Sequence, residues 1–209
     1  MLSDVGKQIK TAFILLVILT ILTGLCYPLM VTALAQLLFP WEANGSILKS
    51  GKTHVGSALI GQSFTSEDYF WGRPSATSPF PYNGESSSGS NSGPSNPQFL
   101  KTVKQRVVHL KHAHSENDDL IPVDLVTASG SGLDPDISPA AAFYQISRIA
   151  KARNIPENQI QDLIQDQITN RPLSLLGEPR VNVLQLNIAL DQLTRQMRNH
   201  HGRSTPQPG

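Results

Sequence analysis

Four segments of this 209-residue chain carry side chains that could do chemistry. The first, from Gly45 to Thr53, contains the glycine, lysine and threonine of a phosphate-binding loop. That motif needs four residues between its glycines, so that successive backbone N–H groups curl around the phosphates. Five residues separate Gly45 from Gly51. We therefore predict that this segment is not a nucleotide-binding loop.

The second segment holds the histidine cluster of the chain, His109, His112 and His114. Two histidines at i, i+3 can share one face of a helix and bind a metal ion. No cysteine accompanies them, and the neighbouring Lys111 would repel a cation. The sequence therefore favours a solvated helix end over a metal site.

The third segment is the acidic turn Asp134-Pro135-Asp136, whose two carboxylates could bind a cation. Asp136, or Ser138 two residues later, could instead accept hydrogen bonds from the first N–H groups of a following helix. We predict the capping role at least as strongly as the cation site.

The fourth segment, residues 126–135, is the most unusual soluble stretch because it consists largely of small and hydroxyl-bearing residues. Such residues let a backbone approach a surface closely and offer hydrogen bonds to a ligand or partner. A hydrolase would need Ser129 or Ser131 beside a base that a third group orients, and no histidine lies near in sequence. We predict a recognition loop or a tight turn, with these candidate residues: Ser129, Gly130, Ser131, Gly132 and Asp134.

All four segments follow an apolar run from Ala12 to Leu38 that contains no acidic or basic side chain. At about 1.5 Å per residue, a helix of this length crosses a hydrocarbon core of about 30 Å. Lys7 and Lys10 precede the run, so the positive-inside tendency predicts a cytoplasmic N-terminus (1–11), a membrane helix (12–38) and an outer domain (39–199). Cleavage as a signal peptide at Ala33-Leu34-Ala35 is the disfavoured alternative, because the apolar run continues past that site.

Polar and helix-bending residues within the run are candidates for contact with a second membrane helix. They are Thr23, Gly24, Tyr27, Pro28, Thr32 and Gln36. The alternative is that the threonine hydroxyls bond their own backbone and that Pro28 is a simple kink. The sequence leaves these two interpretations open.

Composition predicts one neutral outer domain of the α+β class. Of 17 basic and 16 acidic residues, two and one precede the apolar run, which leaves 15 of each after it. This balance disfavours nucleic acid as a partner. Apolar periodicity and helix-start residues predict four helices and two strands, followed by a disordered tail at 200–209. The helices begin at Asn96, Ser138-Pro139, Pro156-Glu157 and near Asn182, and the strands cover 54–60 and 120–127.

The serine-rich run from Ser86 to Gly93 has two interpretations. It could be a flexible linker, or an ordered loop that packs on a partner. Composition alone favours the linker.

Several blocks of this sequence resemble the C subunit of the Kdp potassium-transporting ATPase. The strongest are Pro122-Val123-Asp124 through to Pro139, and the run from Gly177 to Leu184. Further matching blocks are Tyr27-Pro28-Leu29, Phe39-Pro40, Ala43 to Ser46, Gly56 to Gln62, Phe70 to Ala76, and Gly89-Ser90-Asn91 with Gly93-Pro94. The chain departs from the family at Ser88, at a Phe80-Pro81 insertion and in a long tail after Asn199.

The resemblance implies a non-catalytic subunit of a high-affinity potassium uptake complex in the bacterial inner membrane, with one membrane helix and a periplasmic domain. It implies three partners: a channel-like potassium-binding subunit (KdpA), a P-type ATPase subunit (KdpB) and a very small membrane peptide (KdpF). The family is described as assisting ATP binding by the ATPase subunit, as a catalytic chaperone. We expect no cofactor bound directly to this chain.

The predicted topology conflicts with direct contact between ATP and the 129–132 segment, because ATP is cytosolic and that segment lies outside. We therefore expect an indirect effect, in which the domain packs on the channel-like subunit near the potassium entrance. Two other classes stay open, a membrane-anchored periplasmic binding protein and a periplasmic hydrolase.

Overall fold

The computed structural model describes residues 2–171 and 177–203. The chain divides into two compact units, one ending at Ile47 and the other beginning at Leu48, and each is described by itself.

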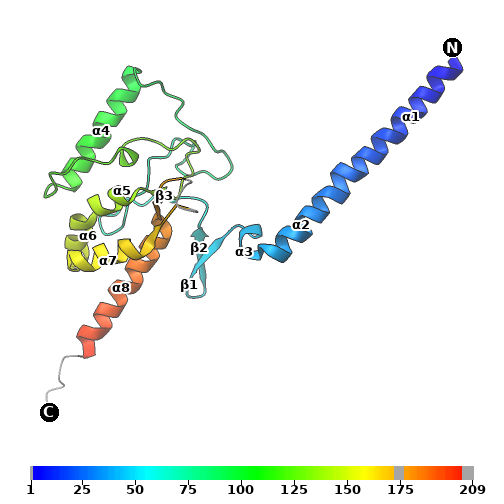
Figure 1. The fold of residues 1–209 in the computed structure, drawn as a ribbon. Helices are drawn as coiled ribbons and strands as arrows, with labels where there is room; N and C mark the ends of the chain where they lie inside the picture. Colours follow the sequence, from blue (N-terminus) through cyan, green and yellow to red (C-terminus); the bar gives the residue numbers. More distant parts are fainter. Residues whose placement is uncertain (1, 172–176, 204–209) are drawn as a thin grey trace. The chain divides into compact units, whose positions relative to one another are not determined.

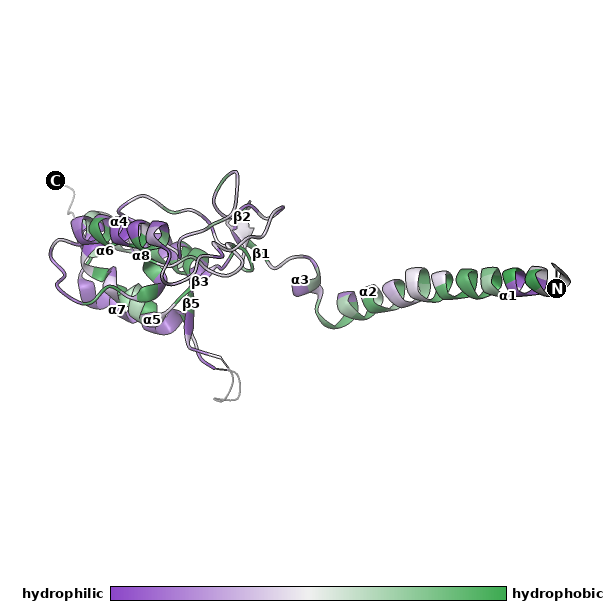
Figure 2. Cartoon of the chain, turned by 90° about the horizontal axis from the view of Figure 1, so that it is seen from above, coloured by the Kyte–Doolittle hydropathy of each residue, from purple (hydrophilic) through white to green (hydrophobic). Residues whose placement is uncertain are grey.

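The first unit is one long apolar helix with a short helical turn after it. It comprises α1 (Leu2–Ile21), a π-helical turn η1 (Leu22–Cys26), α2 (Tyr27–Leu38) and α3 (Pro40–Ala43). The stretch Val5–Leu38 is long and apolar enough to cross a membrane, and none of it is buried within the protein. Figure 2 shows hydrophobic residues around most of this helix. The predicted N-terminal apolar helix is confirmed.

The π-helical turn ends at Cys26, two residues before Pro28. In an α-helix Pro28 cannot donate to the carbonyl of Gly24, and its ring crowds that carbonyl. The wider turn relieves this conflict, with Tyr27 N–H donating to the carbonyl of Leu22, five residues back. The predicted bend at Gly24 and Pro28 is therefore a change of helix type.

The second unit is an α+β domain, which confirms the predicted class (Figure 1). Its helices are α4 (Pro97–Ala113), α5 (Pro139–Tyr144), α6 (Ile146–Arg153), α7 (Glu157–Gln167) and α8 (Val183–Arg203), with a 3₁₀ turn η2 (Val123–Leu125). A two-stranded sheet pairs β1 (Ile47–Ser50) with β2 (Thr53–Ser57). A three-stranded sheet has the order β3 (Asp136–Ile137), β5 (Arg180–Asn182), β4 (Ile168–Thr169), and both of its pairings are antiparallel.

All four predicted helix starts are confirmed; α7 begins at Glu157 without a side-chain cap, and the other three have side chains that accept hydrogen bonds from the first turn. Asn96 accepts from the N–H groups of Gln98 and Phe99, and Ser138 accepts from the N–H of Ala141. Such caps satisfy N–H groups that have no partner within the helix. Asn182 likewise accepts from the N–H of Gln185 in the first turn of α8.

The second predicted helix is broken at Gln145 into α5 and α6. The side chain of Gln145 donates to the carbonyl of Ala141 at 3.1 Å, which is the acceptor that its own N–H would use in a continuous helix. That N–H donates instead to the carbonyl of Ala142. A side chain that competes with the backbone therefore interrupts the helix.

The core lies where α7 packs against α6 and α8 (Figure 1), and β5 contacts α5, α7 and α8. Its fully buried apolar side chains include Ile149, Ile160, Ile164, Val181, Leu186 and Leu190. In the sheet, Val181 of β5 lies opposite both Ile137 and Ile168. The apolar stripes predicted for the last three helices therefore meet in one core.

The strand predicted over 120–127 is wrong. Leu120 and Val123 are 94% and 69% exposed, and residues 123–125 form the 3₁₀ turn η2 instead. Asp124 accepts hydrogen bonds from the N–H and hydroxyl of Ser138, which fixes this segment beside the start of α5. The apolar side chains in this run do not share one buried face.

The segment that resembled a phosphate-binding loop forms the β1–β2 hairpin. A phosphate-binding loop leads into a helix, whereas Gly51 and Lys52 form the turn that leads into β2. At the other end of the chain, α8 continues to Arg203, past the predicted boundary at His200. The remaining residues of the predicted tail, 204–209, lie outside the described residues.

Residues 58–96, all of which the structure describes, contain no helix or strand. Side chains of α6, of α8 and of Gln145 hold the centre of this irregular stretch. Each of the five successive carbonyls from Glu67 to Trp71 accepts a hydrogen bond from one of these side chains. The pairs, donor first, are Arg148–Glu67, Arg153–Asp68, Arg148–Tyr69, Asn187–Phe70 and Gln145–Trp71.

Two of these side chains also accept from the same backbone. Asn187 accepts from the N–H of Phe70 at 2.9 Å, and Gln145 accepts from the N–H of Trp71 at 2.8 Å. Both amides are fully buried, and so is the Phe70 side chain. Residues 67–71 therefore pair with side chains in place of a neighbouring strand.

Candidate functional site

The small-residue segment is a tight turn that its own hydroxyls close. We call residues 129–134 the central loop. Ser129 accepts from the N–H of Gly132 at 2.9 Å, and Ser131 accepts from the N–H of Leu133 at 3.1 Å. Ser129 is buried, and Gly132 has a φ of +68°. The structure thus agrees with the tight turn expected for this segment.

The serine-rich run packs on the central loop, so the linker interpretation is wrong. The N–H of Ser88 and the hydroxyl of Ser87 both donate to the carbonyl of Ser131, at 2.9 and 3.0 Å. A Cβ on Gly89 would lie 2.7 Å from the carbonyl oxygen of Gly130. The two backbones meet because both segments consist of small residues. The ordered alternative is correct, with the chain's own central loop as the packing surface.

A third segment, residues 73–83, supports the central loop from another side. The Ser75 hydroxyl donates to the carbonyl of Gly132 at 2.7 Å. The Arg73 guanidinium forms an ion pair with Asp134 at 3.1 Å. Burial raises the pKa of Tyr82 to about 12, and its hydroxyl donates to the carbonyl of Arg73. The central loop is therefore connected to the 67–71 segment, because Arg73 and Ser75 come shortly after that segment in the chain.

The solvated helix end predicted for the histidine cluster is correct for His109 and His112, which are exposed, and wrong for His114, which is buried. His114 Nδ1 lies 2.9 Å from the carbonyl of Leu110, and its Nε2 accepts from Arg148 Nε at 3.0 Å. His109 stacks on the indole ring of Trp71, with 5.5 Å between the ring centres. His114 is thus bonded to Arg148 and Leu110 rather than to a serine of the central loop.

The acidic turn is occupied by protein contacts. Asp134 accepts from the N–H of Asp136 at 3.0 Å, in addition to its ion pair with Arg73. Asp136 pairs with Arg180 at 2.9 Å, and burial raises its pKa. Ser138, not Asp136, caps α5. Within the described part of the chain, no group of three His, Cys, Asp or Glu residues is arranged to hold a metal ion.

A cavity of about 420 Å³ lies between α4 and the irregular stretch 58–96, and we call it the Trp71 cavity. Phe64, Trp71, Tyr82, Leu110 and Leu125 contribute apolar or aromatic wall. Arg73, Arg106 and His109 contribute the polar wall. Because Arg73 also pairs with Asp134, one side chain joins the cavity to the central loop.

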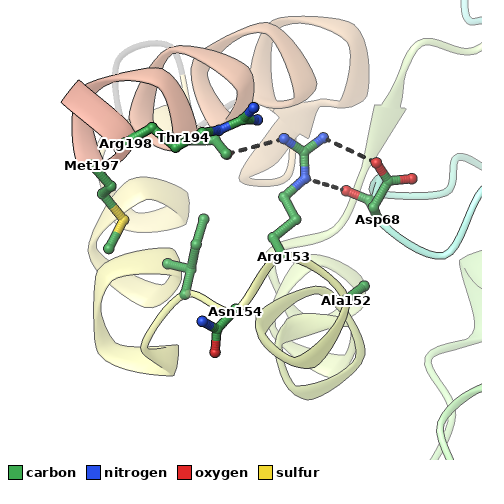
Figure 3. A pocket seen from close by; sticks show the side chains of 8 residues that line it. Asp68, Ala152, Arg153, Asn154, Thr194, Met197 and Arg198 are labelled. Carbon is green, nitrogen blue, oxygen red and sulfur yellow. Dashed lines mark hydrogen bonds and ion pairs between the residues drawn. The ribbon is translucent and has the colours of Figure 1, made fainter. Parts of the chain in front are cut away.

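A second cavity, of about 490 Å³, lies beside the corner between α6 and α7 (Figure 3). Figure 3 shows the Arg153 guanidinium pointing toward Asp68 and Thr194. Arg153 also forms an ion pair with Asp191 at 2.8 Å, and its guanidinium carbon lies 4.6 Å from the centre of the Tyr69 ring. Carboxylates of the protein already meet this cation, so its role is to join α6, α8 and the 67–71 segment.

The candidate membrane-helix residues belong to the first unit. Thr23 and Gly24 lie in the π-helical turn, and Tyr27, Pro28, Thr32 and Gln36 lie in α2. Pro28, Thr32 and Gln36 are spaced four apart and therefore share a face of α2. The Thr23 hydroxyl donates to the carbonyl of Leu19, as the own-backbone alternative predicts, and Gln36 bonds Asn44 at 3.1 Å. Their contact with a second helix stays a prediction.

Sequence reasoning missed Arg73, Ser75 and Arg106 as functional side chains. Arg73 had one usable signal, because it is the single charged residue between Asp68 and Glu85. An isolated charge in a long uncharged stretch needs a partner if it is buried. Ser75 and Arg106 carry no comparable signal, since their roles depend on contacts 57 and 20 residues away.

The comparisons with known proteins agree with the resemblance. The family model described as "K+-transporting ATPase, c chain" (KdpC) matches residues 9–192. The chain belongs to the KdpC family. The match includes most of the apolar helix and nearly all of the α+β domain.

Curated KdpC relatives carry the name "Potassium-transporting ATPase KdpC subunit". The relative from Herpetosiphon aurantiacus is 54% identical over 184 residues, covering 88% of this chain and 95% of the relative. The relative from Methylococcus capsulatus is 54% identical over 187 residues, covering 90% and 98%. The relative from Polynucleobacter asymbioticus is 55% identical over 177 residues, covering 85% and 94%.

Gly132→Ala tests the packing of the serine-rich run on the central loop. A Cβ at position 132 would lie 2.5 Å from the carbonyl oxygen of Ser88, at a φ that L residues rarely adopt. We expect a loss of about 1–3 kcal/mol in the free energy of unfolding, with faster amide exchange at Ser88. Gly130→Ala is the control, because its Cβ meets nothing within 4 Å. Equal stability of the two variants would contradict this packing.

Because His114 is buried, we expect the free energy of unfolding to depend on pH. Burial lowers the pKa of His114 below its usual value of 6.5, so the unfolded chain takes up this proton at a higher pH than the folded chain. The contribution of His114 to the free energy of unfolding is therefore complete above about pH 6.5 and decreases as the pH drops below it. We expect His114→Gln to flatten this slope in urea titrations, since glutamine does not titrate. The exposed His112→Gln variant should retain it, and a slope unchanged in His114→Gln would refute this assignment.

Proposed function

We propose that this protein is the KdpC subunit of a bacterial potassium-transporting ATPase and acts without catalysing a reaction itself. The observation that carries this proposal is the family match over residues 9–192. The relatives are named potassium-transporting ATPase KdpC subunits. This chain matches 94–98% of their length. The likeness is therefore to a whole subunit, helix and domain together.

The partners follow from the family. We infer a channel-like potassium-binding subunit (KdpA), the P-type ATPase subunit (KdpB) and the small membrane peptide (KdpF) in one complex in the inner membrane. The apolar helix is long enough to anchor the chain, and Lys7 and Lys10 before it favour a cytoplasmic N-terminus and a periplasmic domain. This orientation separates the domain from cytosolic ATP.

The contribution to ATP binding is then indirect. The hydroxyls of Ser129 and Ser131 are already engaged with backbone N–H groups of their own loop, and Ser88 covers the carbonyl of Ser131. The central loop therefore offers a preformed surface for a partner and has no unpaired Ser129 or Ser131 hydroxyl with which to bind a phosphate. We infer that the domain packs on the channel-like subunit, stabilises the complex and so promotes ATP binding by the ATPase subunit.

The test is affinity purification of tagged full-length protein from gently solubilised native membranes, with ATPase assays of the recovered material. We expect the ATPase and channel-like subunits to be recovered together, with ATP hydrolysis that potassium stimulates. An unrelated tagged single-helix protein is the control. Recovery of the chain alone, without such activity, would contradict the proposed function.

The indirect mechanism has its own test in the purified chain. We expect no ATP binding by the full-length protein in detergent at millimolar nucleotide, because its loop hydroxyls are occupied. Saturable ATP binding by this chain alone would overturn the indirect mechanism while leaving membership of the complex intact.

A further inference from the structure

The Trp71 cavity combines an apolar interior with a cation that the chain itself does not neutralise. Its walls come from the irregular stretch (Phe64, Trp71), from α4 (Leu110) and from η2 (Leu125). Arg106 reaches this cavity from α4 and donates to the carbonyl of Val126 at 2.9 Å. A carbonyl satisfies one donor of the guanidinium and leaves its charge uncompensated.

Several other arginines of the domain have carboxylate partners, whereas Arg148 bonds carbonyls and the uncharged side chains of His114 and Gln145. Arg73 pairs with Asp134, Arg153 with Asp191 and Arg180 with Asp136. For Arg106, no carboxylate of the described residues lies within ion-pair distance. Burial also lowers its pKa, without an opposing acidic neighbour. A partly buried charge without a counter-charge is costly unless a partner supplies one.

The same cavity has a second guanidinium group with a donor that lacks a hydrogen-bond partner. Arg73 lines it, and the buried Nε of Arg73 has no hydrogen-bond partner among the described residues. Buried polar atoms in folded proteins are nearly always hydrogen-bonded. Two guanidinium groups with unused donors therefore line one apolar cavity.

We propose that the Trp71 cavity receives an acidic side chain, flanked by an apolar residue, from an outward-facing segment of another subunit of the complex. The carboxylate supplies the counter-charge for Arg106, and the apolar residue covers the aromatic and leucine walls. This inference rests on the proposed function, because it requires a complex in which a second subunit meets the domain.

Charge complementarity and the wall composition both select this occupant. A guanidinium and a carboxylate form strong, directional paired hydrogen bonds. A small inorganic anion would leave the apolar walls in contact with water. A zwitterionic phospholipid headgroup would bring a cation next to Arg106. A peptide with adjacent acidic and apolar side chains satisfies both parts of the cavity.

The first experiment compares two charge reversals on α4 in the full-length protein. Arg106→Glu reverses the charge in the cavity, and Lys104→Glu makes the same change at an exposed position two residues earlier. After affinity purification from membranes, we expect Arg106→Glu to reduce recovery of the other subunits about tenfold or more, and Lys104→Glu to leave it unchanged. Equal recovery with both variants would overturn the inference.

A second experiment leaves Arg106 in place, so that a folding defect cannot imitate the result. A photoreactive amino acid replaces Ser63, which is exposed and lines the cavity, and a control chain carries it at exposed Gln161 on α7. We expect the Ser63 probe to label a partner peptide that contains Asp or Glu beside an apolar residue. Reversing that acidic residue to arginine should restore assembly with Arg106→Glu.

The outcomes separate the two proposals. Labelling of lipid, labelling of a peptide without an acidic residue, or no labelling in an intact complex would overturn the cavity inference while the proposed function stands. Recovery of the wild-type chain without other subunits would overturn the proposed function and this inference together.

Discussion

The α+β domain depends on side chains that pair with the backbone of residues 67–71. This segment lies in a stretch without helix or strand, yet the Phe70 side chain is fully buried. A buried backbone group without a partner costs about 1–3 kcal/mol, so the segment can enter the core only if each carbonyl is met. Arg148 and Arg153 from α6, Asn187 from α8 and Gln145 between α5 and α6 provide these bonds.

Everything that positions the central loop follows from this anchoring. The anchored segment leads directly to Arg73 and Ser75, which hold Asp134 and Gly132. The serine-rich run then covers the same loop from its other side. A domain with little regular sheet thus presents a rigid loop and a cavity next to it. A preformed surface of this kind suits the assembly role proposed above, because less conformational entropy is lost on binding.

Local signals predicted where the helices begin, but not how the irregular stretch 58–96 is held in place. Asn96 and Ser138 revealed their helices because a cap acts within three residues. The helix break at Gln145 was not predicted, and the same side chain bonds Trp71, 74 residues away, in a contact that no local pattern contains. His114 looked solvated for the same reason, since Arg148 meets it from another helix. Of the site, the small-residue turn was predictable from composition, whereas the packing of Ser88 on Ser131 and the cavity around Arg106 required the fold.

Amide hydrogen exchange at Phe70 and Trp71 in the full-length protein tests this account most directly. If their N–H groups are held by Asn187 and Gln145, they should exchange about as slowly as amides in the buried part of α8 around Leu186 and Leu190. Exchange as rapid as that of an open surface loop would contradict the anchoring on which the central loop and the cavity depend.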